Sequence, residues 1–93
     1  MLEVGRSYIY SYDPVSYEII KILSEDDKYY NIEVIYIDYI YKDTEIYNTE
    51  LTKDIIDIDR YKDFKLTLYN KLKDIILQNQ DKLFFEITNI INQ

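Results

Sequence analysis

The side chains in this sequence that could do chemistry are closely spaced carboxylates and tyrosines. Asp57 and Asp59 are two positions apart, with Asp54 close by. On a strand, the side chains at positions i and i+2 point to the same face, about 6.6 Å apart. Two carboxylates at that spacing could hold Mg²⁺, as in a nuclease, or present anionic groups at roughly the spacing of phosphates.

A second acidic run, formed by Glu25, Asp26 and Asp27, could bind Ca²⁺ weakly through its carboxylate oxygens. The sequence lacks the Asp-x-Asp-x-Asp-Gly pattern of a calcium-binding loop. Charged side chains in turns and at strand ends are usually solvated. We therefore expect both carboxylate groups to be solvated, and we predict no metal and no other cofactor.

Tyr8, Tyr10 and Tyr12 occupy alternate positions, so they share one face of a predicted strand. If this face is exposed, the three rings form a protein-binding ridge, because tyrosine is enriched at binding hot spots. If the face points inward, the rings belong to the core. We expect a curved sheet to have one inner face, and the intervening row contains two serines. The pattern therefore favours the core, with the binding ridge as the alternative.

The residues on which most enzymes rely are missing from the chain. It has no His and no Cys, so the usual general base, the thiol nucleophile and the best transition-metal ligands are absent. Its single glycine excludes the glycine-rich loops that bind phosphates. No serine stands in the context of a nucleophile elbow. We therefore expect a protein that is not an enzyme and has no catalytic residues.

Charge is divided unevenly along the chain. Residues 1–59 contain 14 acidic and 5 basic residues, whereas residues 60–93 contain 4 acidic and 6 basic residues. Ten of the twelve tyrosines lie in the acidic part, between Tyr8 and Tyr47. The net charge of −7 disfavours direct binding to nucleic acid and to anionic membranes, because both attract Lys and Arg. A protein with a basic surface is the expected partner.

Length and composition predict a single domain over residues 1–93, with an acidic β module over 1–59 and a helical segment over 60–93 packed on it. Neither a secretory signal nor an apolar run long enough for a membrane span is visible. The absence of cysteine gives no sign of an oxidising compartment. We therefore expect a cytoplasmic protein that does not bind membranes.

Alternating and β-branched patterns predict strands in the acidic part. The four main segments are Ser7–Tyr12, Tyr17–Leu23, Tyr29–Tyr41 and Thr44–Leu51. The third is too long for one flat strand, so we expect it to bend strongly or to pass a bulge near Asp38. A short fifth strand is predicted over Asp54–Asp59, with a helical turn as the alternative.

The remaining residues follow the spacing of helices. One apolar stripe runs from Tyr61 to Ile76 and a second from Leu83 to Ile91, on either side of a polar stretch around Asn79. Two helices are favoured over one long helix, because both stripes can then fold back onto the sheet. Strands followed by helices are typical of an α+β fold. We predict a small curved antiparallel sheet of four or five strands followed by one or two C-terminal helices.

Strand lengths and turn spacing in the first part also resemble those of a small SH3-like barrel. The resemblance covers segment 4–10, a turn, and the strand over 17–22. It implies a highly curved sheet and carries no motif that points to a function.

Small size, acidity and the missing catalytic residues together lead to the hypothesis of an inhibitor that acts by binding. It would occupy a basic, nucleic-acid-binding surface of a larger protein, with carboxylates replacing phosphates and tyrosine rings supplying desolvated area. The composition resembles that of phage-encoded anti-defence proteins, such as anti-CRISPR proteins, and of toxin-neutralising immunity proteins. The alternative is a structural or adaptor module that oligomerises through its C-terminal helices.

The candidate contact residues for this partner lie in the acidic part of the chain, on its predicted strands and turns. They are Tyr8, Tyr10, Tyr12, Glu25, Asp26, Asp27, Asp38, Asp43, Glu45, Asp54, Asp57 and Asp59. As an inhibitor the protein is expected to be a monomer, whereas the adaptor hypothesis predicts a small homo-oligomer.

Overall fold

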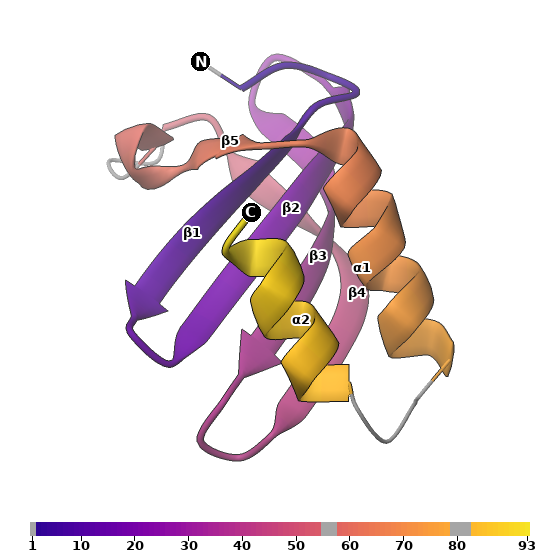
Figure 1. Cartoon of the computed structure of the whole chain (residues 1–93). Coiled ribbons are helices and arrows are strands. Elements are labelled where there is room, and N and C mark those ends of the chain that lie inside the picture. Colours follow the sequence, from indigo (N-terminus) through magenta and orange to yellow (C-terminus); the bar gives the residue numbers. More distant parts are fainter. Residues whose placement is uncertain (1, 55–57, 79–82) are drawn as a thin grey trace.

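The computed structural model describes residues 2–54, 58–78 and 83–93, and its main element is an antiparallel sheet (Figure 1). The sheet has five strands in the order β4-β3-β2-β1-β5. The strands are β1 (Ser7–Asp13), β2 (Ser16–Glu25), β3 (Tyr29–Asp38), β4 (Asp43–Thr52) and β5 (Lys62–Phe64). The sheet is open, with β4 and β5 at its two edges.

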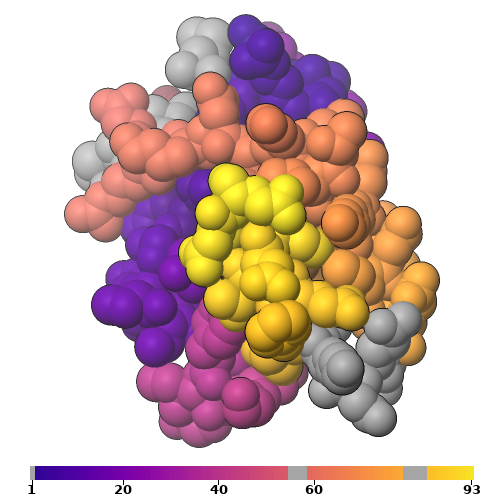
Figure 2. Space-filling view, viewed as in Figure 1, coloured from indigo at the N-terminus to yellow at the C-terminus, as the bar shows by residue number. Residues whose placement is uncertain are grey.

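Two helices, α1 (Leu66–Gln78) and α2 (Leu83–Ile91), cover one face of this sheet (Figures 1 and 2). Tyr69 and Leu72 of α1 and Ile87 of α2 are fully buried in one cluster with Ile19 and Ile35 of the sheet. This arrangement confirms the predicted α+β fold and the two separate helices. Neither helix in the described segments is long and apolar enough to cross a membrane.

In the described segments, the other face of the sheet, which we call the helix-free face, carries no α-helix and still has a buried core. Its buried residues are Leu2, Tyr8, Ile20, Ile22, Tyr30, Ile32 and Val34. Leu51 at the end of β4 and Tyr61 before β5 pack against them. Neighbouring residues of β2 such as Ile19 and Ile20 are therefore both buried, one on each face. The expectation that the sheet has only one inner face was wrong.

The tyrosine row of β1 is split between core and surface. Tyr8 and Tyr10 are buried, whereas Tyr12 is 57% exposed. Ser7 of the intervening row is also buried, and its hydroxyl donates a hydrogen bond to the Phe64 carbonyl at 2.6 Å. Pairing with β5 extends only over Ser7–Ile9, so burial along β1 fades toward the β1–β2 turn.

An acidic side chain, Glu33 of β3, anchors α1 to the sheet. Its carboxylate accepts hydrogen bonds from the Tyr69 hydroxyl at 2.8 Å and from Lys73 Nζ at 2.9 Å. Burial alone would raise the pKa of Glu33, but these bonds outweigh it and hold the pKa below its usual value. The contact therefore stabilises the fold above the unfolded-state pKa of Glu33 and loses this effect as the pH falls through the folded-state pKa.

Two predicted strand boundaries were wrong. The fifth strand is Lys62–Phe64, and Ile58–Arg60 forms a 3₁₀ helix, so the described end of the predicted strand Asp54–Asp59 is not extended. The third strand ends at Asp38 and has no bulge there, since its register with β4 runs unbroken to Asp43. The length of β5 is set by β1, which pairs with it over three residues. The end of β3 is set by Asp38, whose side chain accepts hydrogen bonds from the backbone beyond it and so turns the chain.

The variant Leu72→Ala should lower the free energy of unfolding by about 2–5 kcal/mol, because it empties a fully buried position between α1 and the sheet. Leu77→Ala in the same helix is the matched control. Leu77 is 65% exposed, so its truncation should change stability by less than about 0.5 kcal/mol. Urea denaturation measures both variants, and equal losses would contradict the packing of α1.

Candidate functional site

A row of alternating tyrosines and glutamates crosses the helix-free face of the sheet. Tyr10 of β1 pairs with Glu18 of β2. Tyr36 of β3 lies opposite Glu18 on one side and opposite Glu45 of β4 on the other. The Cβ atoms of paired residues are about 4.5–5.5 Å apart in antiparallel sheets, so neighbours along the row are within contact range. Four strands therefore contribute to one polar and aromatic row, in which Tyr10 and Glu18 are buried, Tyr36 is half-buried and Glu45 is exposed.

Glu18 forms the floor of this row, with 9% of its surface exposed. Its two carboxylate oxygens accept hydrogen bonds from the hydroxyls of Tyr12, at 2.5 Å, and Tyr61, at 3.1 Å. In the segments that the structure describes, no Lys or Arg forms an ion pair with Glu18. A shielded carboxylate held only by neutral donors leaves a negative charge that no cation of these segments compensates directly.

Tyrosine rings surround Glu18 at steep angles to one another. The ring centroids of Tyr10 and Tyr12 are 4.8 Å apart, with an interplanar angle of 64°. Tyr61 lies 5.2 Å from Tyr10, and Tyr36 lies 6.5 Å from Tyr12 at 66°. Arg60, just before β5, donates a hydrogen bond from Nη1 to the Tyr10 hydroxyl at 3.0 Å. The edge-to-face pairs Tyr10–Tyr12 and Tyr12–Tyr36, together with the tilted pair Tyr10–Tyr61, fix the rings around the carboxylate.

The hydroxyls around Glu18 stay protonated far above neutral pH. Burial and the adjacent Glu18 carboxylate raise the pKa values of Tyr12 and Tyr61 well above the usual value of about 10. Burial also raises the pKa of Tyr47, with further contributions from the carboxylates of Glu18 and Glu45. At neutral pH the surface therefore combines carboxylate charge with neutral aromatic rings.

Further carboxylates continue the row toward the turns. Asp38, at the end of β3, lies opposite Asp43, the first residue of β4. Oδ1 of Asp38 accepts hydrogen bonds from the backbone N–H groups of Ile40, at 2.9 Å, and Tyr41, at 3.1 Å. The Asp43 and Glu45 side chains are exposed. The structure thus places these three predicted acidic candidates on β3 and β4, at the same end of the sheet as Tyr12.

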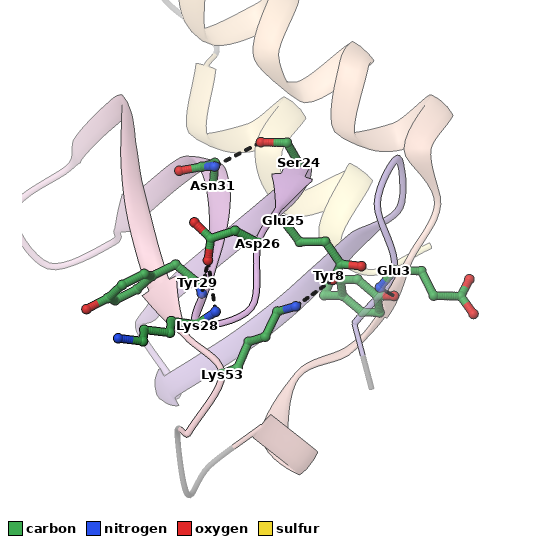
Figure 3. A network of polar contacts seen from close by, with 9 residues as sticks. All are labelled: Glu3, Tyr8, Ser24, Glu25, Asp26, Lys28, Tyr29, Asn31 and Lys53. Atoms are coloured by element: carbon green, nitrogen blue, oxygen red, sulfur yellow. Dashed lines mark hydrogen bonds and ion pairs between the residues drawn. The ribbon is translucent and has the colours of Figure 1, made fainter.

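The predicted candidates Glu25, Asp26 and Asp27 lie at the opposite end of the sheet, around the β2–β3 turn. Figure 3 shows Glu25 and Asp26 there. Oδ1 of Asp26 accepts hydrogen bonds from the backbone N–H groups of Lys28, at 2.9 Å, and Tyr29, at 2.8 Å. These bonds hold the pKa of Asp26 below its usual value. Asp26 thus has a structural role in closing the turn.

Two more candidates at this end of the sheet are engaged in contacts within the chain (Figure 3). Glu25 forms an ion pair with Lys53 at 3.2 Å. Tyr8 is buried, and its hydroxyl accepts a hydrogen bond from the backbone N–H of Glu3 at 2.9 Å. Tyr8 therefore adjoins Tyr10 along β1 but belongs to the buried core. The β2–β3 turn lies at the other end of the sheet from the exposed part of the tyrosine and glutamate row.

The predicted carboxylate pair near the end of the acidic part can be placed only in part. Asp57 lies outside the described residues. Asp59 is exposed in the 3₁₀ helix, and Asp54 follows β4, with its backbone N–H donating to Thr52 Oγ1 at 3.4 Å. Among the described residues, no three carboxylates gather closely enough to hold a metal ion.

Glu18, Tyr36, Tyr47 and Tyr61 belong to this surface but are not among the candidates predicted from the sequence. Glu18 carries a usable signal, because it is the single acidic residue in the apolar segment Tyr17–Leu23. The positions of Tyr36 and Tyr47 next to Glu18 and Glu45 depend on strand register, which the sequence does not specify. Tyr61 reaches Glu18 only through the path of the chain from β4 to β5.

Comparisons of the chain with models of protein families, with curated proteins and with solved structures found no match. A function for the protein therefore has to follow from the chemistry of its own surface.

An alkaline titration should show the coupling between the tyrosines and the fold. Tyr12 and Tyr61 hold their protons more tightly when folded, so the unfolded state loses protons first and stability should fall as the pH rises above about 10. Tyrosinate absorbance and circular dichroism, followed together, should show a late ionisation phase that coincides with unfolding. Tyr61→Phe should remove one tyrosine from this late phase, and its loss from an earlier phase would contradict the Glu18 contact.

Proposed function

We propose that this protein is a non-enzymatic binding protein that docks its tyrosine and glutamate row on the basic surface of a larger protein. The observation that carries the proposal is the alternation of Tyr10, Glu18, Tyr36 and Glu45 across the sheet face opposite α1 and α2. Tyrosine supplies area that gains from desolvation, while the carboxylates select a cationic partner.

Exposure and charge at this end of the sheet support the proposal. Tyr12 and Tyr47 are 57% and 42% exposed, so their rings are available to a partner. The neighbouring carboxylates of Asp43 and Glu45 are exposed as well. Opposite charges on this surface and on the partner would raise the rate of association. This rate would fall as salt increases, because salt screens the attraction between the charges.

We further propose that the protein acts as an inhibitor in the cytoplasm. A basic protein surface commonly serves to bind nucleic acid, and carboxylates can replace phosphates in the contacts that Arg and Lys make. A partner covered by this surface would lose access to its nucleic acid. This is the mode of action proposed above for an anti-defence or immunity protein.

Capture from cells of its host, with the tagged full chain, tests this function. One variant, Asp38→Asn/Asp43→Asn/Glu45→Gln, removes the charge of Glu45 in the row and two charges next to it. Its matched control, Glu25→Gln/Asp26→Asn/Asp27→Asn, removes three charges at the other end of the sheet. We expect the first variant to lose a basic partner that the control retains, and capture to weaken as salt rises. The purified partner should then bind nucleic acid less well when the wild-type chain is present.

Three results would contradict the proposed function. They are equal capture by the two triple variants, capture that does not change between low and high salt, and a captured partner whose binding to nucleic acid is unaffected by the chain. Circular dichroism of both variants checks that the removed charges leave the fold intact.

The adaptor hypothesis has one observation in its favour. Phe85 of α2 is 71% exposed and Leu77 of α1 is 65% exposed, so the helices keep some apolar surface. However, Ile87 and Ile90 of the second stripe are buried within the chain, where they pack with the sheet. An assembly through the helices would therefore have to use the exposed residues around Phe85.

Light scattering over a range of protein concentrations separates the two functions. We expect a monomer, with no change of mass in the variant Phe85→Ser. A stable oligomer that Phe85→Ser dissociates would favour the adaptor hypothesis, because this substitution removes exposed apolar area without touching the buried stripe.

A further inference from the structure

We propose that the row receives the cationic end of a single Arg or Lys side chain from the partner. The proposed cation site consists of the rings of Tyr12, Tyr36 and Tyr47 and the carboxylates of Glu18 and Glu45, all on one face of the sheet. The inference rests on the proposed function, because it names the chemical group that the partner inserts into the surface.

The rings have the placement that such a cation needs. An ammonium or guanidinium group is attracted to an aromatic face when it lies within about 6 Å of the ring centroid. The centroids of Tyr12 and Tyr36 are 6.5 Å apart, and the rings are inclined at 66°. A cation near this corner can therefore contact both rings at once, while the half-exposed ring of Tyr47 lies along the same face.

The carboxylates leave hydrogen-bonding capacity for the same cation. A carboxylate offers about four acceptor positions, and the hydroxyls of Tyr12 and Tyr61 occupy two of those on Glu18. Glu45 is exposed, lies opposite Tyr36 and has no ion pair within the described segments. A guanidinium or ammonium group could therefore donate to carboxylate oxygens while it stacks on the rings.

The chain itself shows that its aromatic residues accept cations. Lys53 Nζ lies 5.0 Å from the ring centroid of Tyr30, and Lys42 Nζ lies 5.4 Å from that of Phe84. At the rim of the row, Arg60 donates to the Tyr10 hydroxyl.

The rings of the proposed cation site are not used in this way within the described segments. Over the described residues, no Lys or Arg lies on the ring of Tyr12, Tyr36 or Tyr47. Open rings beside carboxylates that form no ion pair within the described segments point to a cation supplied by a partner.

Titration of the full chain with short capped peptides tests this inference. The probes are Gly-Arg-Gly, Gly-Lys-Gly and Gly-citrulline-Gly. Citrulline keeps the shape of arginine and lacks its charge. Nuclear magnetic resonance of ¹³C-labelled tyrosine rings reports the binding site. We expect shifts at Tyr12, Tyr36 and Tyr47 with a cationic peptide, and no saturable shift with citrulline. The arginine and lysine arms show which cation binds better.

Glu45→Gln and Glu50→Gln provide a matched pair of variants. Both residues are exposed on β4 and both changes remove one negative charge, but the two side chains point to opposite faces. Glu45→Gln should weaken peptide binding about fivefold, the scale of one cation contact, and Glu50→Gln should leave it unchanged. Tyr47→Ala should also weaken binding, whereas Tyr41→Ala, in the exposed β3–β4 turn, should not.

Equal binding of the arginine and citrulline peptides, or equal effects of the two glutamate variants, would overturn the proposed cation site. This failure can be told apart from failure of the proposed function. If partner capture depends on the carboxylates of Asp38, Asp43 and Glu45 but the peptides do not shift the rings, the cation site is wrong and the docking surface remains. If the peptides bind at the row but capture does not depend on it, the cation site remains and the docking function is wrong.

Discussion

The burial of β2 and β3 on both faces is the constraint on which the rest of the structure depends. Ile19 faces the helices and Ile20 faces the helix-free core, and both are fully buried. A chain of 93 residues has little apolar surface to spare, so a second core on the same sheet adds stability that a single face could not supply. The two helices cover one side, while Leu2, Leu51 and Tyr61 close the other.

This double burial leaves two acidic side chains in shielded positions, and the structure treats them differently. Glu33, under α1, is compensated by Lys73 and Tyr69 and ties the helix to the sheet. Glu18, on the opposite face, is held by the hydroxyls of Tyr12 and Tyr61 and has no cation paired with it in the described segments. The first arrangement ties α1 to the sheet. The second leaves the negative charge of Glu18 for the positively charged group of the proposed partner.

Tyrosine serves both purposes because one end of its side chain is apolar and the other is polar. Tyr69 is fully buried, yet its hydroxyl finds the Glu33 carboxylate. Tyr12 is mostly exposed, and its hydroxyl turns inward to Glu18. The abundance of tyrosine in the acidic part therefore reflects core filling at some positions and an open aromatic surface at others.

The sequence by itself determined the α+β order, four of the strands and both helices, because apolar periodicity and turn residues act locally. It also placed Asp38, Asp43 and Glu45 among the candidate contacts. Only the tertiary structure decided that β5 is Lys62–Phe64 and that Tyr10, Glu18, Tyr36 and Glu45 form one row. Strand register joins residues far apart in the chain, and one step of slippage would move each side chain to the other face. No local pattern encodes that choice, so the surface emerges only when the strands pair.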